Sequence, residues 1–241
     1  MRLVDFSFDS PADNLALEEA ILNAVERDES EDTIRFWEST SPFVVLGVGQ
    51  VLREEVNEAA CARDAVPVLR RCTAGGCVVQ GPGCLNFSLF LRYDRFPEVR
   101  QLRPSYCYIL KGVVEALQSL GVSAQIEGVS DLAVSGMKIS GNAQKRRKFA
   151  ILHHGTVLYS MDPALMERYL LEPTTRPEYR GTRSHLEFVR PVALDPFALR
   201  GAIGHVLHAP STAVLPAKSE LDECAALSRT KYSQREWTYR R

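Results

Sequence analysis

Residues 69–88 read Leu69-Arg70-Arg71-Cys72-Thr73-Ala74-Gly75-Gly76-Cys77-Val78-Val79-Gln80-Gly81-Pro82-Gly83-Cys84-Leu85-Asn86-Phe87-Ser88. A short β-type run, Val66 to Leu69, precedes the glycines of this stretch, and a longer one, Leu85 to Leu91, follows them. P-loops and Rossmann turns place their glycines where a strand gives way to a helix. A glycine-rich segment between two strands therefore argues against both of these nucleotide-binding motifs.

Two arginines stand directly before the glycines. Backbone N–H groups can approach an anionic ligand where no Cβ intrudes, and the guanidinium groups of Arg70 and Arg71 offer bidentate contacts. The pattern predicts an anion site. The alternative is a glycine-rich hairpin with solvated arginines.

Composition excludes several classes of protein. The chain has 241 residues, of which 45% are hydrophobic, enough for a substantial core in one large domain or two small ones. A formal net charge of -1 gives no general attraction to nucleic acid or to membranes. The N-terminus lacks the apolar core of a secretion signal, and no apolar run approaches membrane-spanning length. We therefore expect a cytoplasmic protein without nucleic-acid or membrane partners.

The six cysteines form no C-x-x-C pair and have no His-x-x-x-His partner, which disfavours a zinc site. We expect free thiols that serve in packing, and no metal ion held by protein side chains. Cys72, Cys77 and Cys84 lie in the glycine-rich stretch, where a nucleophile is the alternative.

Patterns along the rest of the chain predict a mixture of helices and strands. Ser10-Pro11 starts a helix to about Arg27, with Glu18 and Glu19 outside its apolar face, and Ser105 caps another helix that buries Tyr108. The expected strands are 3–8, 33–38, 42–47, 122–126 and 151–158, and the expected helices are 10–27, 53–65, 105–120, 196–207 and 219–228. Residues 92–104 read as a polar surface loop, and residues 163–190 as a mobile flap or docking loop.

A second informative stretch covers residues 131–158. Alternation around Ser135-Gly136 predicts a β-hairpin, with Lys138 just beyond its turn and Gly141 in the returning strand. The following strand carries His153 and His154, which must point to opposite faces of a sheet.

Three motifs, in this order and spacing, resemble those of the lipoate-protein ligase family. They are Arg-Arg-x-x-x-Gly-Gly with Leu-Asn-Phe-Ser behind it, Gly-x-Lys-Ile-Ser-Gly-x-Ala-Gln-x-Arg, and His-His-Gly-Thr. The resemblance implies an α/β fold with a mainly antiparallel sheet flanked by helices, as in class II synthetases. It extends to residues 231–239, expected to form the last strand. It also implies that residues 1–241 form a single catalytic domain without the family's C-terminal accessory domain.

The resemblance also implies roles for individual residues. Lys138 would be the catalytic residue, contacting the acyl carboxylate and the α-phosphate of ATP; a solvated hairpin lysine is the alternative. The implied substrate-binding residues are Trp37, Arg70, Arg71, Gly75, Gly76, Cys77, Val78, Val79, Asn86, His154 and Gly155, and the implied nucleotide-binding residues are Asp131, Lys138, Ser140, Gly141 and Ala143. Trp37 could equally be a core aromatic. Lys145, Arg146 and Arg147 would reach ATP phosphates or an acidic carrier, or form a solvated face.

Several functions remain open. An ATP-dependent ligase would use ATP, Mg²⁺ and lipoate or octanoate to modify a lipoyl carrier domain of the 2-oxoacid dehydrogenase E2 or glycine cleavage H protein type. A separate accessory-domain protein could assist it. The alternatives are a cofactor-free octanoyl or lipoyl transferase with a cysteine thioester, and a non-catalytic acyl- or nucleotide-binding subunit. Residues 128–130 and 159–162 lack the cysteine that transferase branches carry there, and the loop typical of biotin ligases is absent.

Overall fold

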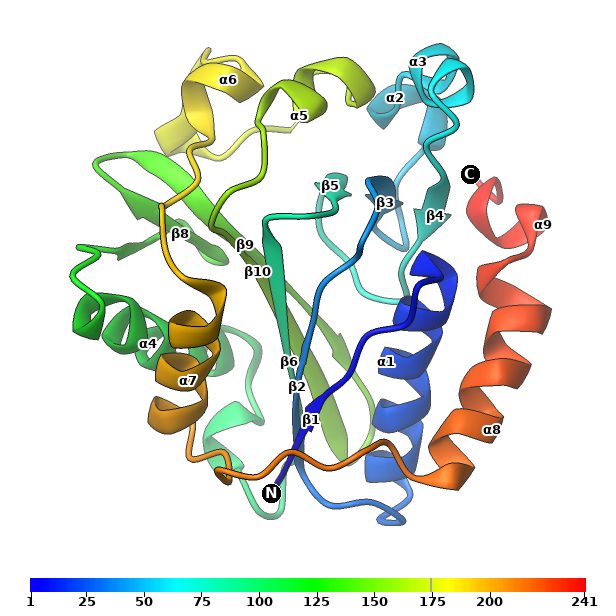
Figure 1. The fold of residues 1–241 in the computed structure, drawn as a ribbon, viewed down its shortest axis with the longest axis vertical. Helices are drawn as coiled ribbons and strands as arrows, with labels where there is room; N and C mark the ends of the chain where they lie inside the picture. The colour runs from blue at the N-terminus through cyan, green and yellow to red at the C-terminus, as the bar shows by residue number, and fades with distance from the viewer. Residues whose placement is uncertain (174) are drawn as a thin grey trace.

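A seven-stranded sheet forms the centre of the computed structural model (Figure 1), which describes residues 1–173 and 175–241. Its strand order is β1-β2-β6-β10-β9-β8-β7, and every neighbouring pair is antiparallel except β1 and β2. The strands are β1 (Arg2–Asp5), β2 (Thr33–Trp37), β6 (Cys84–Arg92), β7 (Gln125–Glu127), β8 (Asp131–Val134), β9 (Met137–Arg146) and β10 (Ala150–Leu158). The predicted α/β fold with a mainly antiparallel sheet is thus confirmed.

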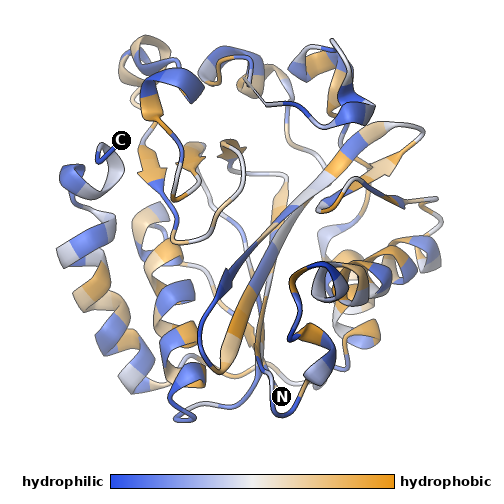
Figure 2. Ribbon diagram, turned by 180° about the vertical axis from the view of Figure 1, so that it is seen from behind, coloured by the Kyte–Doolittle hydropathy of each residue, from blue (hydrophilic) through white to orange (hydrophobic). Residues whose placement is uncertain are grey.

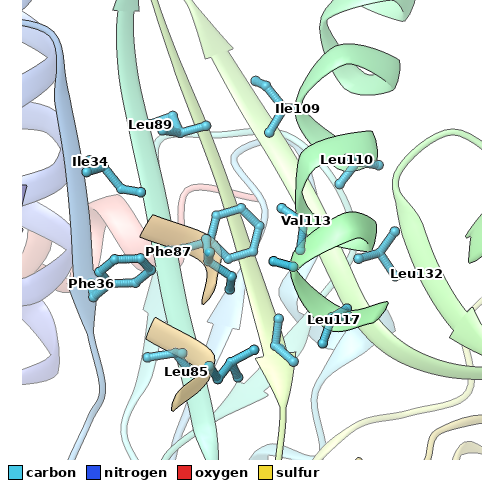
Figure 3. Packing of buried hydrophobic residues seen from close by; sticks show 14 of the residues in the cluster. Ile34, Phe36, Leu85, Phe87, Leu89, Ile109, Leu110, Val113, Leu117 and Leu132 are labelled. Atoms are coloured by element: carbon cyan, nitrogen blue, oxygen red, sulfur yellow. The ribbon is translucent and has the colours of Figure 1, made fainter. Parts of the chain in front are cut away.

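Helices cover both faces of this sheet. In Figure 1, α1 (Pro11–Glu26) and α8 (Lys218–Leu227) lie on one side, and α4 (Leu102–Ser119) and α7 (Pro196–Val206) lie on the other. Figure 3 shows how Leu85, Phe87 and Leu89 of β6 meet α4, where Ile109 and Val113 are fully buried. Apolar surface is thus buried on both faces of the sheet, which forms the central layer of the molecule.

A smaller sheet lies beside the upper end of the large one in Figure 1. It has the order β4-β3-β5, with β3 (Phe43–Leu46) parallel to β4 (Val68–Arg70) and antiparallel to β5 (Val78–Gln80). Around it lie the short helices α2 (Leu52–Glu55), α3 (Glu58–Arg63), α5 (Ala164–Tyr169) and α6 (His185–Phe188). The N-terminal helix α1 packs against both sheets, because its apolar cluster includes Phe43 and Val45 of β3 as well as Phe90 and Leu152.

The two predicted landmarks of the hairpin are confirmed. Ser135 and Gly136 both have positive φ angles, 50° and 75°, as a two-residue type I′ turn requires, and Lys138 follows directly in β9. On β10, His153 faces α4 and packs edge-to-face against Tyr106, whereas His154 faces α1 and contacts Glu18. The N-cap of α1 is also confirmed, because Ser10 accepts a hydrogen bond from the Asp13 amide at 3.3 Å.

Other expectations were wrong at particular points. The segment 53–65 is not one helix, because Val56 is extended between α2 and α3 and pairs with Leu170. The helix α4 begins at Leu102, so Ser105 lies within it, and Tyr108 is 46% exposed and not buried. The loop 92–104 contains the short 3₁₀-helix η1 (Pro97–Val99).

The C-terminal segment contradicts the expectation of a last strand. Residues 231–239 belong instead to the π-helix η3 (Ser228–Tyr232) and the short helix α9 (Arg235–Thr238). The indole N–H of Trp237 donates to the backbone oxygen of Arg70 at 2.7 Å, which fastens α9 to the edge strand β4. The apolar positions of this segment therefore pack against a sheet edge without joining it.

The acidic residues of α1 also lie elsewhere than expected. Glu18 and Glu19 are 2% and 6% exposed, because α1 is covered by the sheet on one side and by α8 and η3 on the other. Figure 2 shows blue, hydrophilic segments along α8 and α9, which alternate in α8 with orange, hydrophobic ones. Among the described helices, none has the length and apolar character needed to cross a membrane.

Candidate active site

A cavity opens between the two sheets and beneath the segment that joins α5 to α6. It has two connected lobes: a smaller inner lobe of about 150 Å³ beside Leu15 and Trp37, and a larger outer lobe of about 500 Å³ beside α5 and α6. The residues that line both lobes are Gly75, Gly76, Cys77, Val78, Gln80, Ser130, Asp131, Lys138, Gly141 and Thr156. The glycine-rich stretch and the hairpin therefore meet at the junction of the lobes.

Lys138 supplies a positive charge at this junction. Its ammonium donates to Asp131 Oδ1 at 2.8 Å, and its side chain is 26% exposed. An added Cβ on Gly141 would lie 3.1 Å from the Lys138 ammonium, so the glycine leaves room for that group over β9. The position of Lys138 is thus determined by Asp131 on β8 and by the absence of a side chain at Gly141.

A buried polar network forms one wall of the inner lobe. His154 Nδ1 contacts Glu18 Oε2 at 2.7 Å, and His154 Nε2 contacts the Thr73 hydroxyl at 2.9 Å. Arg71 donates to the same Thr73 hydroxyl at 2.8 Å. The network thereby connects α1, β10 and the glycine-rich loop through side chains alone.

The pKa of Glu18 reflects this environment. Burial alone would raise the pKa, but the nearby His154, Arg35 and Ser88 together lower the pKa of Glu18 to about 2. The carboxylate also accepts from the Trp37 indole at 3.1 Å. Trp37 therefore has its polar edge bonded to Glu18, while the residue lines the inner lobe.

Close side-chain contacts explain the glycine at position 155, and a positive φ angle explains the glycine at position 75. A Cβ on Gly155 would lie 1.9 Å from Asn142 Oδ1 and 2.5 Å from the Phe87 ring, so β9 and β10 can pair at this register only with glycine there. Gly75 has a φ of 91°, a conformation in which a side chain is strained. Both glycines line the inner lobe.

The two arginines before the glycines have different surroundings. Arg70 is completely buried and lines neither lobe; its guanidinium donates to the backbone oxygens of Thr238, Gly47 and Gln50. Arg71 lines the inner lobe and donates to the backbone oxygens of Ala74 and Gly76 at 2.7 and 2.9 Å. Arg71 thus holds the glycine-rich loop from within the cavity wall, whereas Arg70 connects the segment after β3 to α9.

The structure brings most of the other sequence-predicted residues to the same cavity. Cys77, Val78 and Asp131 line both lobes, Val79 lines the outer lobe, and Asn86, Ala143 and His154 line the inner lobe. Ser140, by contrast, is fully buried in β9 and lines neither lobe. Lys145, Arg146 and Arg147 lie outside both lobes as well; Arg147, for example, contacts Glu19 at 3.4 Å.

The cysteines of the glycine-rich stretch are poor nucleophiles where they lie. Burial raises the pKa of Cys72 to about 11 and the pKa values of Cys77 and Cys84 to about 12. Cys77 is the one of these three that lines the cavity. Its thiol is therefore protonated at neutral pH.

Several residues of the cavity, and Glu18 of the polar network beside it, were not identified from the sequence. Glu18 looked like a solvated helix position, and its burial depends on α8 and η3, which lie some 200 residues further along the chain. Gln80, Ser130 and Thr156 line both lobes; none of them was assigned a role from the sequence, although each lies in a stretch considered there and Thr156 ends the His-His-Gly-Thr motif. Arg180 lines the outer lobe from residues 163–190, and Thr174 in that segment lies outside the described residues.

Comparison with known proteins agrees with this geometry. Residues 10–193 match the lipoyl protein ligase A/B catalytic domain. The chain belongs to this family. Among its relatives, lipoate–protein ligase 1 of Staphylococcus aureus is 31% identical over 182 residues, which are 72% of this chain and 51% of that protein. The chain thus spans about half the length of that relative.

Another relative of this chain is named as an octanoyltransferase and not as a ligase. Octanoyltransferase LipM of Brevibacillus brevis is 26% identical over 265 aligned positions, which cover 96% of both chains. The family is therefore one of enzymes, lipoate-protein ligases and octanoyltransferases.

Solved structures of the family have the same fold. A chain from the bipartite lipoate protein ligase and E2 lipoyl domain of Thermoplasma acidophilum has a TM-score of 0.85 and 25% identity, with 99% of this chain and 95% of that one covered. A lipoate-protein ligase A bound with ATP has a TM-score of 0.81 and 25% identity, with 99% and 98% covered.

Proposed function

We propose that this member of the family is an ATP-dependent lipoate-protein ligase. The observation that carries the proposal is the junction of the two lobes, which Lys138, Gly75 and Gly76 all line. An acyl chain in the inner lobe and a nucleotide in the outer lobe would bring a carboxylate and an α-phosphate to this one positive charge.

The proposed first step forms an acyl adenylate. A carboxylate oxygen of lipoate or octanoate attacks the α-phosphorus of ATP, and pyrophosphate leaves. The Lys138 ammonium stabilises the negative charge that develops on the phosphoryl oxygens, which a compact primary ammonium does well in a partly dehydrated site. Mg²⁺ would arrive with the ATP phosphates, since no cluster of three metal-ligating side chains exists among the described residues.

The proposed second step transfers the acyl group to protein. A neutral lysine amine of a lipoyl carrier domain attacks the carbonyl of the mixed anhydride, and AMP leaves as an amide forms. We propose a carrier of the E2 or H protein type as partner, and residues 1–241 as one catalytic domain assisted by a separate accessory chain. The bipartite ligase of T. acidophilum, which is similar in fold, supports such an arrangement.

The second candidate is an ATP-independent octanoyl or lipoyl transferase. The similarity to LipM over nearly the whole of both chains favours it. The thioester chemistry requires a reactive thiol, however, and burial raises the pKa of the cavity thiol, Cys77, to about 12. Ser130 lines both lobes where the transferase branches were expected to carry a cysteine. The ligase is therefore the better-supported function.

Pyrophosphate release tests the proposal. We expect the purified chain, with or without an accessory partner, to release pyrophosphate from ATP when lipoate or octanoate is added. The Lys138→Ala variant should lose adenylate formation by about 100-fold or more, because it removes the charge at the reacting phosphate. Its circular dichroism and melting temperature should remain close to those of the wild type.

A second lysine variant serves as the control for Lys138→Ala, and two results would contradict the proposed ligase mechanism. Lys145→Ala removes a lysine from the same strand, β9, outside both lobes, and should leave adenylate formation unchanged. Normal turnover by Lys138→Ala would remove that lysine from the mechanism. Acyl transfer from an octanoyl carrier without ATP, lost in Cys77→Ser, would establish the transferase instead.

A further inference from the structure

One carboxylate, that of Asp131, binds two side chains that come from distant parts of the chain. Asp131 Oδ1 accepts from the Lys138 ammonium at 2.8 Å, and Asp131 Oδ2 accepts from the Tyr179 hydroxyl at 2.8 Å. We propose that Tyr179 is a positioning residue: through Asp131 it fixes the Lys138 ammonium at the lobe junction and fastens the segment above the cavity to the hairpin. The inference rests on the proposed function only for the role of Lys138.

Tyr179 belongs to a segment that we call the strap, residues 171–173 and 175–184. The strap joins α5 to α6, and Pro173, Thr175, Pro177 and Arg180 within it line the outer lobe. Tyr179 itself lies in the 3₁₀-helix η2 (Glu178–Arg180) and lines neither lobe. Its side chain thus acts through Asp131 and not by touching a ligand.

The surroundings of Tyr179 and Asp131 favour a stable hydrogen bond between them. Asp131 is 7% exposed, so leaving Oδ2 without a donor would be costly. Burial and the negative charge of Asp131 raise the pKa of Tyr179, which keeps the hydroxyl protonated and able to donate. The Tyr179 ring also packs on Phe188, with centroids 5.0 Å apart.

Other contacts fix the C-terminal end of the strap, and the chain that follows α6, to the same hairpin. Arg183 donates to the backbone oxygen of Gly136 at 2.9 Å, and the Arg190 amide donates to the backbone oxygen of Lys138 at 3.0 Å. The backbone of Lys138 is therefore held independently of Asp131. Tyr179 governs only the ammonium end of this lysine and the central part of the strap.

The first test compares Tyr179→Phe with a matched control. Tyr159→Phe removes a similar hydroxyl, which donates to Glu38 Oε1 at 2.8 Å away from both lobes. We expect Tyr179→Phe to slow adenylate formation about tenfold through kcat and to hasten trypsin cleavage after Arg180 and Arg183 about tenfold, as loss of one hydrogen bond to a charged group predicts. Tyr159→Phe should change neither rate.

The second test uses the shared carboxylate. Asp131→Ala, which removes both acceptor oxygens, should expose the strap to trypsin as Tyr179→Phe does, and the double variant should be cleaved no faster than either single variant. Cleavage fragments are identified by mass spectrometry, so the readout is independent of enzyme activity. If the wild type forms no adenylate, the proposed function fails, while the cleavage rates still decide the role of Tyr179.

Two results would overturn the positioning role. One is that trypsin cleaves the Tyr179→Phe variant after Arg180 and Arg183 no faster than it cleaves the wild type. The other is additive acceleration in the double variant, which would mean that Tyr179 and Asp131 act on the strap separately.

Discussion

At the scale of the residue, the wall of the inner lobe depends on one buried carboxylate. Glu18 accepts hydrogen bonds from Trp37 and Ser88 and contacts His154, which connects three elements of the fold. Its pKa is lowered to about 2, so it is ionised in the folded protein across the whole physiological range. A buried charge of this kind is tolerated only when every partner is present.

The pKa of Glu18 predicts a pH dependence of stability. Because its folded pKa, about 2, lies below the ordinary value of 4.5, ionised Glu18 stabilises the fold above pH 4.5, and this contribution is lost as the pH falls toward 2. Glu18→Gln should lower the free energy of unfolding by at most about 3 kcal/mol at pH 7. Urea denaturation at pH 7 and pH 3 measures the difference, which should shrink at the lower pH. An equal difference at both values would contradict the prediction.

Single residues also show where sequence-based prediction succeeds. The resemblance to the ligase family led us to expect Lys138, Gly75 and Gly76 at one site, and all three line both lobes of the cavity. The guanidinium of Arg70 was not placed correctly in space, since its carbonyl partners on Thr238 and Gly47 are brought together only by the tertiary fold. A long side chain next to a glycine-rich turn can point into a cavity or behind it, and sequence does not distinguish the two.

At the scale of the element, the pairing of β9 with β10 depends on Gly155. We expect Gly155→Ala to lower the free energy of unfolding by about 3 kcal/mol, because its Cβ would overlap Asn142 Oδ1 and the Phe87 ring. The control is Gly201→Ala in α7, where nothing lies within 4 Å of an added Cβ; it should stabilise the protein by about 0.5–1 kcal/mol. Chemical denaturation measures both. Equal effects of the two substitutions would show that the close contact is absent.

Elements with strong local signals were predicted well, and those decided by distant contacts were not. The hairpin β8–β9 and the helix α1 have turn and cap residues that specify them locally. The segment 231–239 was expected to be a strand from the family resemblance, yet it contributes to η3 and α9, where Trp237 and Tyr232 have partners on β4 and α1. Val56 likewise breaks a helical run to pair with Leu170, more than 100 residues away.

At the scale of the whole molecule, the cavity lies where two sheets meet. Gly75, Gly76 and Val78 belong to the small-sheet side, and Asp131, Lys138 and Gly141 belong to the large sheet. The helix α1 packs against both sheets and contributes Leu15 to the inner lobe. A ligand that fills both lobes would thus add a second connection between the sheets.

This arrangement predicts strong stabilisation by a non-hydrolysable acyl-adenylate analogue, such as a lipoyl sulfamate of adenosine. At 100 times its dissociation constant, such a ligand adds about 2.7 kcal/mol, which corresponds to a rise of roughly 5–10 °C in melting temperature for a chain of this size. Differential scanning calorimetry measures the shift. At the same concentration, lipoate or ATP alone, each confined to one lobe, should give smaller shifts than the analogue. Lys138→Ala should reduce the shift that the analogue causes, because the charge at the junction is gone. Equal shifts with ATP alone and with the analogue would mean that the inner lobe does not hold the acyl chain.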